Sequence, residues 1–140
     1  MMSQNMTAVP DDEFFVACRK GKADVVSAYL DSGADPSARD EYRFTGLICA
    51  GRNGHLQVAQ LLLGRGADME AGDIRGRTAL FHAATYKRYD LVEFLAKFGA
   101  NVNPVDSHGW TPLDFSIMSS HKKMARLLES LGGLGRYTKQ

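Results

Sequence analysis

The sequence predicts an all-α solenoid in which short helix–turn–helix units stack side by side. Glycine, aspartate and threonine each recur with a constant step of 33 residues. The positions are Gly33, Gly66, Gly99 and Gly132; Asp40, Asp73 and Asp106; and Thr45, Thr78 and Thr111. Three residue types that share one period indicate repeated structural units, and a period of about 20–50 residues is typical of stacked repeats.

Each unit has the pattern of a turn followed by two helices, most clearly in the third unit. Asp73 and Gly76 are spaced as in a tight turn, and Thr78 stands where the N-cap of the first helix belongs. Leu80, Ala83 and Ala84 give this short helix a small-residue face, which lets neighbouring helices approach closely. The second helix follows after a bend and ends at Gly99, which is placed like a C-terminal cap. One such unit cannot bury its apolar face alone, so its neighbours must cover it.

The motifs of these units resemble those of the ankyrin repeat family. Gly-Trp-Thr-Pro-Leu at residues 109–113 resembles the family's Gly-x-Thr-Pro-Leu. Gly-Ala-Asn-Val-Asn at residues 99–103 and Gly-Ala-Asp at residues 66–68 resemble its Gly-Ala-Asp-Val-Asn. Asn-Gly-His-Leu at residues 53–56 matches the bend between its two helices. The resemblance implies an L-shaped stack of helix pairs with β-turn fingers that project to one side.

The resemblance covers about residues 11–133 and predicts four repeats, followed and preceded by short mobile tails. The repeats are expected at about residues 11–39, 40–72, 73–105 and 106–133, and the tails at 1–10 and 134–140. At the bend of the third and fourth repeats, Lys87 and Ser120 replace glycine and are expected in the left-handed conformation.

The second repeat departs most from the pattern. Arg43 stands where other fingers have glycine, so its turn is expected to be strained or of another type. Gly51 lies inside the first helix, where glycine costs about 1 kcal/mol relative to alanine. We expect residues 40–54 to exchange amide hydrogens faster than residues 73–87. Gly51→Ala is expected to stabilise the chain if the small-residue face has room for a methyl group.

Composition limits the class of function. Seventeen basic and 16 acidic residues give a net charge of +1, which makes the chain a poor general binder of nucleic acid. The apolar runs are too short to cross a bilayer, and the start of the chain has no secretory pattern. Two cysteines cannot form a disulfide scaffold. We expect a soluble, intracellular monomer, in the cytoplasm, the nucleus or both.

The sequence has no constellation that predicts catalysis. Cys18 and Cys49 are interpreted as small core residues, and His55 and His121 as hydrogen-bonding residues at the bends. Histidine and cysteine spacing does not match a metal site, and no cofactor is expected. The serines near His121 lack the pocket and oxyanion hole that a catalytic triad requires. A non-enzymatic function is therefore predicted.

The resemblance implies that partners meet the finger tips and the exposed faces of the first helices. The residues carried over are Arg39, Glu41, Tyr42, Phe44, Arg52, Asn53, Ile74, Arg75, Arg77, Thr85, Tyr86, Ser107, His108, Trp110 and Met118, with Arg43 and Ser119 beside them. Aromatic residues and arginines dominate the energetics of interfaces. The alternative is that the aromatic side chains pack along neighbouring fingers and the arginines are ordinary solvated charges.

On this surface, arginines outnumber the one free acid, Glu41, once the turn aspartates are set aside. The surface therefore favours a partner segment with acidic and apolar residues. The predicted function is a non-catalytic protein–protein interaction module that acts as an adaptor, a scaffold or a stoichiometric inhibitor. One alternative is inhibition of an enzyme such as a kinase; a less favoured one is a nucleic-acid-associated regulator, because aromatic and arginine surfaces also stack bases.

Residues 95–103 resemble the ankyrin segment that asparagine hydroxylases recognise, which makes Asn103 a candidate modification site. The alternative is that Asn103 only orders its finger through side-chain hydrogen bonds.

Overall fold

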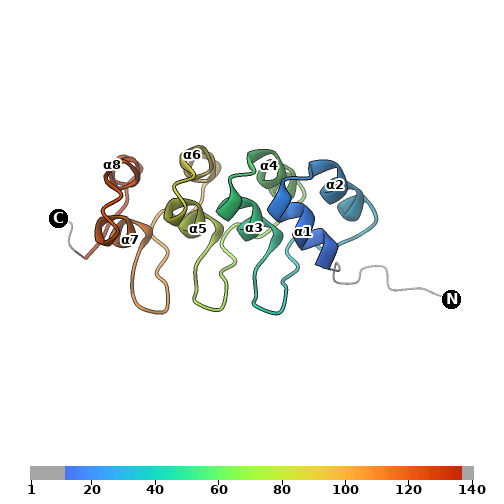
Figure 1. The fold of residues 1–140 in the computed structure, drawn as a ribbon, viewed down its shortest axis with the longest axis horizontal. Helices are drawn as coiled ribbons and strands as arrows, with labels where there is room; N and C mark the ends of the chain where they lie inside the picture. The colour runs from blue at the N-terminus through green and yellow to red at the C-terminus, as the bar shows by residue number, and fades with distance from the viewer. Residues whose placement is uncertain (1–11, 137–140) are drawn as a thin grey trace.

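A computed structural model describes residues 12–136, which form eight helices arranged as four successive pairs (Figure 1). The helices are α1 Asp12–Lys20, α2 Ala23–Asp31, α3 Gly46–Asn53, α4 Leu56–Gly64, α5 Ala79–Thr85, α6 Tyr89–Phe98, α7 Pro112–Met118 and α8 Lys122–Ser130. Each pair packs against the next along the chain. The predicted all-α solenoid of helix–turn–helix units is therefore confirmed.

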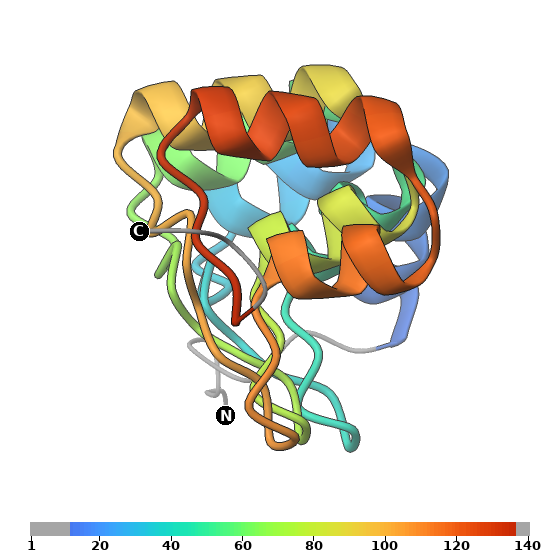
Figure 2. The same ribbon diagram turned by 90° about the vertical axis from the view of Figure 1, so that its left-hand side faces the viewer.

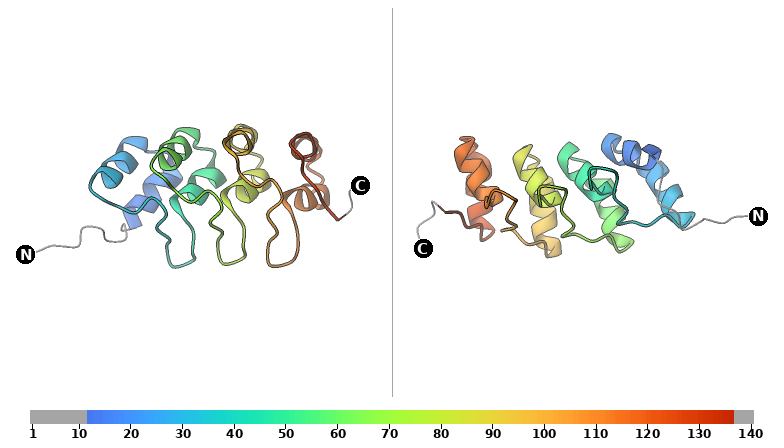
Figure 3. Two further views of the ribbon diagram at one scale, coloured as in Figure 1. Left: turned by 180° about the vertical axis from the view of Figure 1, so that it is seen from behind. Right: turned by 90° about the horizontal axis from the view of Figure 1, so that it is seen from below.

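The two helices of each pair lie in different layers. The first helices, α1, α3, α5 and α7, form one layer, and the second helices, α2, α4, α6 and α8, form the other (Figure 3). Three loops project from the layer of first helices, and the end-on view shows them at an angle to the helices (Figure 2). We call these loops finger 1, finger 2 and finger 3, with turns at residues 40–44, 73–77 and 106–110.

The first helices α3 and α5 are short and almost fully buried, because another first helix packs on each side of each of them. Each helix that follows a finger begins at a threonine whose hydroxyl oxygen accepts a backbone hydrogen bond, as predicted. Thr45 accepts from Ile48 at 3.1 Å. Thr111 accepts from Asp114 at 3.2 Å, and the Asp114 carboxylate accepts the amide of Thr111 in return, which completes a capping box.

An aspartate orders the turn of each finger, as predicted. In finger 2 the Asp73 carboxylate accepts the amides of Arg75 and Arg77 at 2.8 and 3.1 Å. Finger 1 has the same turn, because Arg43 adopts the left-handed conformation that Gly76 adopts in finger 2, with φ values of 64° and 78°. The turn of finger 1 is thus of the same type and strained. Lys87 and Ser120 are left-handed as well, which confirms the prediction for the bends.

Glycines in α3 permit close packing between repeats, which corrects the expectation for Gly51. A Cβ atom at Gly51 would lie 3.0 Å from the carbonyl oxygen of Ala79 in α5. A Cβ atom at Gly46 would lie 2.9 Å from the Cys18 sulfur in α1. A methyl group at Gly51 therefore requires the backbone of α5 to shift by a few tenths of an ångström, and Gly51→Ala is expected to destabilise the stack.

The hydrogen-bonded structure continues beyond residue 133, the predicted end of the repeat domain. The amide of Leu134 donates to the Asn103 side chain at 2.6 Å, and the amide of Arg136 donates to the Asp114 carboxylate at 2.8 Å. The predicted tail at residues 1–10, and residues 137–140, lie outside the described residues.

Candidate functional site

Fingers 1 and 2 and the first helices behind them enclose a hollow of about 410 Å³, which we call the finger 1–2 hollow. Its lining comes from finger 1, α3, finger 2 and α5, including the C-cap residue of α5. The lining residues are Tyr42, Phe44, Arg52, Asp73, Ile74, Arg75, Arg77, His82 and Tyr86. Seven of them, all except Asp73 and His82, belong to the set that the sequence predicted as partner-binding. The hollow therefore brings together residues from both predicted surfaces, the finger tips and the helix faces.

Arg52 is held in this hollow by two aromatic rings. Its guanidinium carbon lies 5.1 Å from the ring centre of Phe44 and 5.0 Å from that of Tyr86. One guanidinium N–H donates to the Tyr86 hydroxyl at 2.8 Å. Such cation–π contacts stabilise a partly buried arginine and fix its direction. Phe44 also packs against His82 in the first helix of the next repeat, with ring centres 5.4 Å apart.

His82 is a residue of this hollow that sequence reasoning missed. It is buried, and its Nε2 lies 2.8 Å from an Asp73 carboxylate oxygen. Burial lowers the pKa of His82, an effect that the bond to Asp73 opposes and that Arg52 and Arg77 reinforce. Burial acts to raise the pKa of Asp73, but the bonds from His82 and two backbone amides outweigh it and lower that pKa. His82 is therefore neutral at neutral pH and donates its N–H to an ionised Asp73.

A second hollow of about 360 Å³, lined by Arg77, His108 and Trp110, lies between fingers 2 and 3. Trp110 is only half-exposed, and its ring centre is 6.2 Å from that of Phe115. Arg77 donates two hydrogen bonds to one carboxylate oxygen of Asp106, each of 3.1 Å. Arg77 is therefore a paired residue that joins two fingers, which corrects the alternative interpretation of it as an ordinary solvated charge; its role in partner binding stays a prediction.

The other predicted residues are distributed around these hollows. Arg39 donates to the carbonyl oxygen of Gly72 at the base of the fingers, so it too joins neighbouring repeats. The hydroxyl of Thr85 is buried in the structure. Of the predicted partner-binding residues, Glu41, Asn53, Ser107 and Met118 are exposed and line neither hollow, and the same is true of Arg43 beside them.

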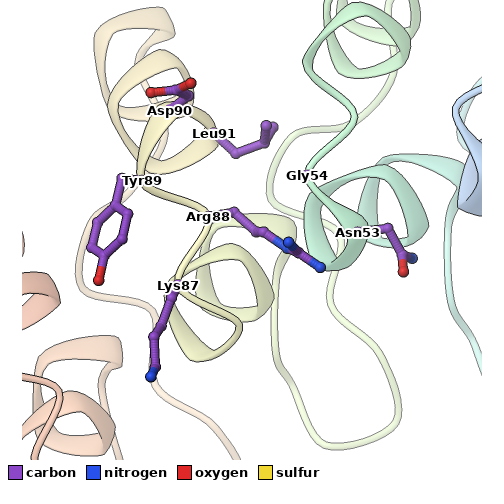
Figure 4. Close-up of a pocket in the computed structure, with 7 residues that line it drawn as sticks. All are labelled: Asn53, Gly54, Lys87, Arg88, Tyr89, Asp90 and Leu91. Carbon is purple, nitrogen blue, oxygen red and sulfur yellow. The ribbon is translucent and has the colours of Figure 1, made fainter.

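Asn53 faces a different depression, at the bend between α5 and α6 (Figure 4). This depression has a volume of about 270 Å³ and is bounded by residues 53–54 and 87–91. Arg88 extends across it and donates to the carbonyl oxygen of Arg52 at 2.9 Å, while the Asn53 side chain donates to that of Cys49 at 2.8 Å. The structure therefore separates Asn53 from the finger 1–2 hollow.

The two cysteines are buried, and the Asn103 side chain, the candidate modification site, is hydrogen-bonded within the fold. Burial raises the pKa of the Cys18 thiol to about 12 and that of Cys49 to about 11, which makes both poor nucleophiles. In residues 12–136 no cluster of three potential metal ligands is found. The Asn103 amide donates to the carbonyl oxygen of Gly132 at 3.1 Å and accepts from Leu134. These bonds order the finger base, and hydroxylation of Asn103 stays a prediction.

Family models match most of the chain. A model described as "Ankyrin repeats (many copies)" matches residues 14–63, and one described as "Ankyrin repeats (3 copies)" matches residues 66–133. The chain belongs to the ankyrin repeat family. Ankyrin repeats are in general protein-binding modules. A comparison with curated proteins finds no match. Among the described helices of this ankyrin stack, none is both long enough and apolar enough to span a membrane.

Proposed function

We propose that this ankyrin protein is a non-catalytic module that holds a segment of a partner protein in the finger 1–2 hollow. The observation that supports this proposal is the exposure of large apolar side chains around one arginine-lined hollow. Tyr42 is 63% exposed, Ile74 72% and Tyr86 45%. Clustered apolar and aromatic groups of this kind mark interaction surfaces in proteins that are otherwise polar at the surface.

The same surface serves an adaptor, a scaffold or a stoichiometric inhibitor, because each of these roles needs only that the partner segment stays bound. The proposed module works as a monomer and uses no cofactor. We propose an intracellular location, in the cytoplasm or the nucleus, which the two free thiols Cys18 and Cys49 favour because such thiols persist in reducing compartments.

The test is affinity capture from native cells with the wild-type chain and the double variant Tyr42→Ala/Ile74→Ala, analysed by quantitative mass spectrometry. Partners of the hollow should be retained by the wild type and lost by the variant. The matched control is Phe98→Ala/Val105→Ala, which removes two apolar side chains of similar exposure, 53% and 57%, that do not line the hollow. If every captured protein survives the first substitution pair as well as the second, the hollow is not the binding surface.

A further inference from the structure

We propose that Arg52 is the carboxylate-binding residue of the finger 1–2 hollow, and that it selects partner segments in which Asp or Glu lies beside an apolar side chain. This inference rests on the proposed function and adds the chemistry of the partner. It depends on a comparison of Arg52 with Arg77, the two arginines that the described structure holds between aromatic rings.

Arg77 shows what an arginine in these surroundings binds. Its guanidinium carbon lies 4.9 Å from the ring centre of Phe81 and 5.4 Å from that of Phe115. The two rings leave the edge of the guanidinium free, and that edge donates two hydrogen bonds to Asp106. A stacked guanidinium is pre-organised for such a carboxylate, because its planar group has already lost most of its freedom.

Arg52 has the same aromatic clamp and no carboxylate. One of its N–H groups donates to the Tyr86 hydroxyl, which leaves donors of the guanidinium available. Within residues 12–136, the contacts found between acidic and basic side chains are Arg65–Asp31, Arg77–Asp106 and the neutral His82 with Asp73, and none of them involves Arg52. A half-buried arginine without a counter-charge attracts an acidic group from outside the protein.

Two acids, Asp73 in the lining and Asp40 outside it, do not take this place. The two oxygens of Asp73 accept the amides of Arg75 and Arg77 and the His82 ring N–H. Asp40, at the start of finger 1, accepts the amides of Tyr42 and Phe44. Both carboxylates order their own fingers, so neither is free to turn toward Arg52.

The surroundings of Arg52 account for the apolar residue of the proposed partner segment. Tyr42 and Ile74 stand exposed on the two fingers that flank the hollow, and Tyr86 closes it on the helix side. An apolar side chain of the partner that contacts these three residues removes water from the hollow and strengthens the bond between Arg52 and a neighbouring carboxylate. Exposed Arg75 adds positive charge at the rim. A segment with an acidic residue next to a large apolar residue therefore fits the hollow.

The experiment uses a phage-displayed library of random peptides selected on the full wild-type chain. Selected peptides are synthesised in pairs, one with the original Asp or Glu and one with Asn or Gln in its place. Their dissociation constants are measured by fluorescence anisotropy against the wild type, Arg52→Gln, Arg52→Lys and the control Arg65→Gln. Arg65 is a suitable control because its guanidinium pairs with Asp31 and does not line the hollow.

The expected result is that selected peptides are enriched in Asp or Glu beside an apolar residue. Arg52→Gln should weaken the acidic peptide by about tenfold or more, since a charge-assisted pair is lost, while the amide peptide changes less than about twofold. Arg52→Lys should restore only a small part of the affinity, because lysine cannot donate as a planar fork between two rings. Arg65→Gln should leave both affinities unchanged.

Two outcomes overturn the inference, and they separate it from the proposed function. The first outcome is that selected peptides require Tyr42 and Ile74 but carry no acid, or bind Arg52→Gln as tightly as the wild type. This outcome rejects Arg52 as the selecting residue and leaves the hollow as the binding surface. Peptides whose affinity is unchanged by Tyr42→Ala/Ile74→Ala bind elsewhere and reject both proposals. The acidic and amide peptides compared on the wild type test the inference even if a variant does not fold.

Discussion

Positions 44 and 77 lie one repeat apart, and their residues join neighbouring fingers in different ways. At the junction of fingers 1 and 2, Phe44 packs with its ring centre 5.4 Å from that of His82, and His82 binds Asp73. At the junction of fingers 2 and 3, Arg77 binds Asp106 directly. The contacts between the finger tips also differ between the two junctions.

The tips of fingers 2 and 3 are joined by a hydrogen bond from the amide of Ser107 to the carbonyl oxygen of Arg75, at 2.8 Å. Within the described residues no equivalent bond joins Ile74 to Tyr42. The second junction therefore satisfies the charge of Arg77 and a backbone amide internally, whereas the first leaves Arg52 without an acidic partner and apolar groups exposed. The comparison teaches that one repeat geometry can satisfy an arginine at one junction and leave one unpaired at the next, where we propose that a partner binds.

The largest test of this comparison is Arg77→Ala. It leaves the Asp106 carboxylate, whose side chain is 0% exposed, without its cation, while Arg77 itself is 16% exposed. Breaking a fully buried pair costs about 3–5 kcal/mol, and partial exposure reduces this to about 2–3 kcal/mol. Urea unfolding should show this loss for Arg77→Ala and a loss below about 0.5 kcal/mol for exposed Arg75→Ala. Equal losses would show that Arg77 is an ordinary surface charge.

The second test concerns the helices of the same junctions. Gly51 in α3 faces α5, and the residue one repeat later is Ala84. Because a Cβ at Gly51 would lie 3.0 Å from the Ala79 carbonyl oxygen, Gly51→Ala should destabilise the chain by about 1–2 kcal/mol. The matched control is Gly64→Ala at the end of α4, where nothing lies within 4 Å of the added atom. This control should be neutral or stabilise by up to about 1 kcal/mol. Thermal unfolding of the two variants measures the difference, and stabilisation by both would reject close packing at Gly51.

The sequence predicts the features that each repeat specifies locally. The threonine caps, the aspartate turns and the left-handed Lys87 and Ser120 follow from residue type and from position within the period. Contacts between repeats are harder to predict, because they depend on which residue stands opposite in the next unit. Arg52 and Arg77 look alike in the sequence, and only one of them meets an aspartate.

Two further residues show the same limit. His82 gave no motif, since its partner Asp73 is defined by the fold of the finger. Its signal was positional: Cys49 and Phe115 occupy the same place in the neighbouring repeats, so a polar residue there requires a nearby polar partner. Gly51 matched the pattern of a weak helix in the sequence. The close contact that an added Cβ atom would make depends on the position of Ala79 in α5, which the sequence does not show.

The third test uses pH, because the junction of fingers 1 and 2 contains the one contact between a histidine and an acid found in the described part of the chain, His82 with Asp73. The pKa of His82 is lowered by burial, against the opposing effect of Asp73, so the unfolded chain binds a proton at this residue more readily than the folded one. Its contribution to stability is present above the ordinary histidine pKa of about 6.5 and is lost as the pH falls toward the folded value. Asp73, whose pKa is also lowered, adds a further loss below about pH 4.

The measurement is the free energy of unfolding between about pH 7 and 5, in which range Asp106, whose pKa is lowered, stays ionised. His82→Gln keeps a donor that can reach Asp73 and removes the titration, so its stability should vary less with pH than that of the wild type. Identical pH profiles for the two proteins would place the acid sensitivity elsewhere in the chain.

The smallest expected effect concerns the strain in finger 1. Arg43 has a φ of 64°, a conformation that costs a non-glycine residue about 1–2 kcal/mol, whereas Gly76 adopts it in finger 2 without that cost. Arg43→Gly should stabilise the chain by about 0.5 kcal/mol, because glycine relieves the strain but gives the unfolded chain more freedom.

Amide exchange reports the same difference locally. Residues 40–44 should exchange faster than residues 73–77 in the wild type, since finger 1 is strained and has no hydrogen bond to the tip of finger 2. Arg43→Gly should reduce this difference in exchange rate without removing it, because the substitution does not create a hydrogen bond between the tips of fingers 1 and 2. Equal protection of the two fingers in the wild type would mean that the packing of Phe44 against His82 holds finger 1 as firmly as the ion pair holds finger 2, and the contrast between the junctions would then be one of binding chemistry alone.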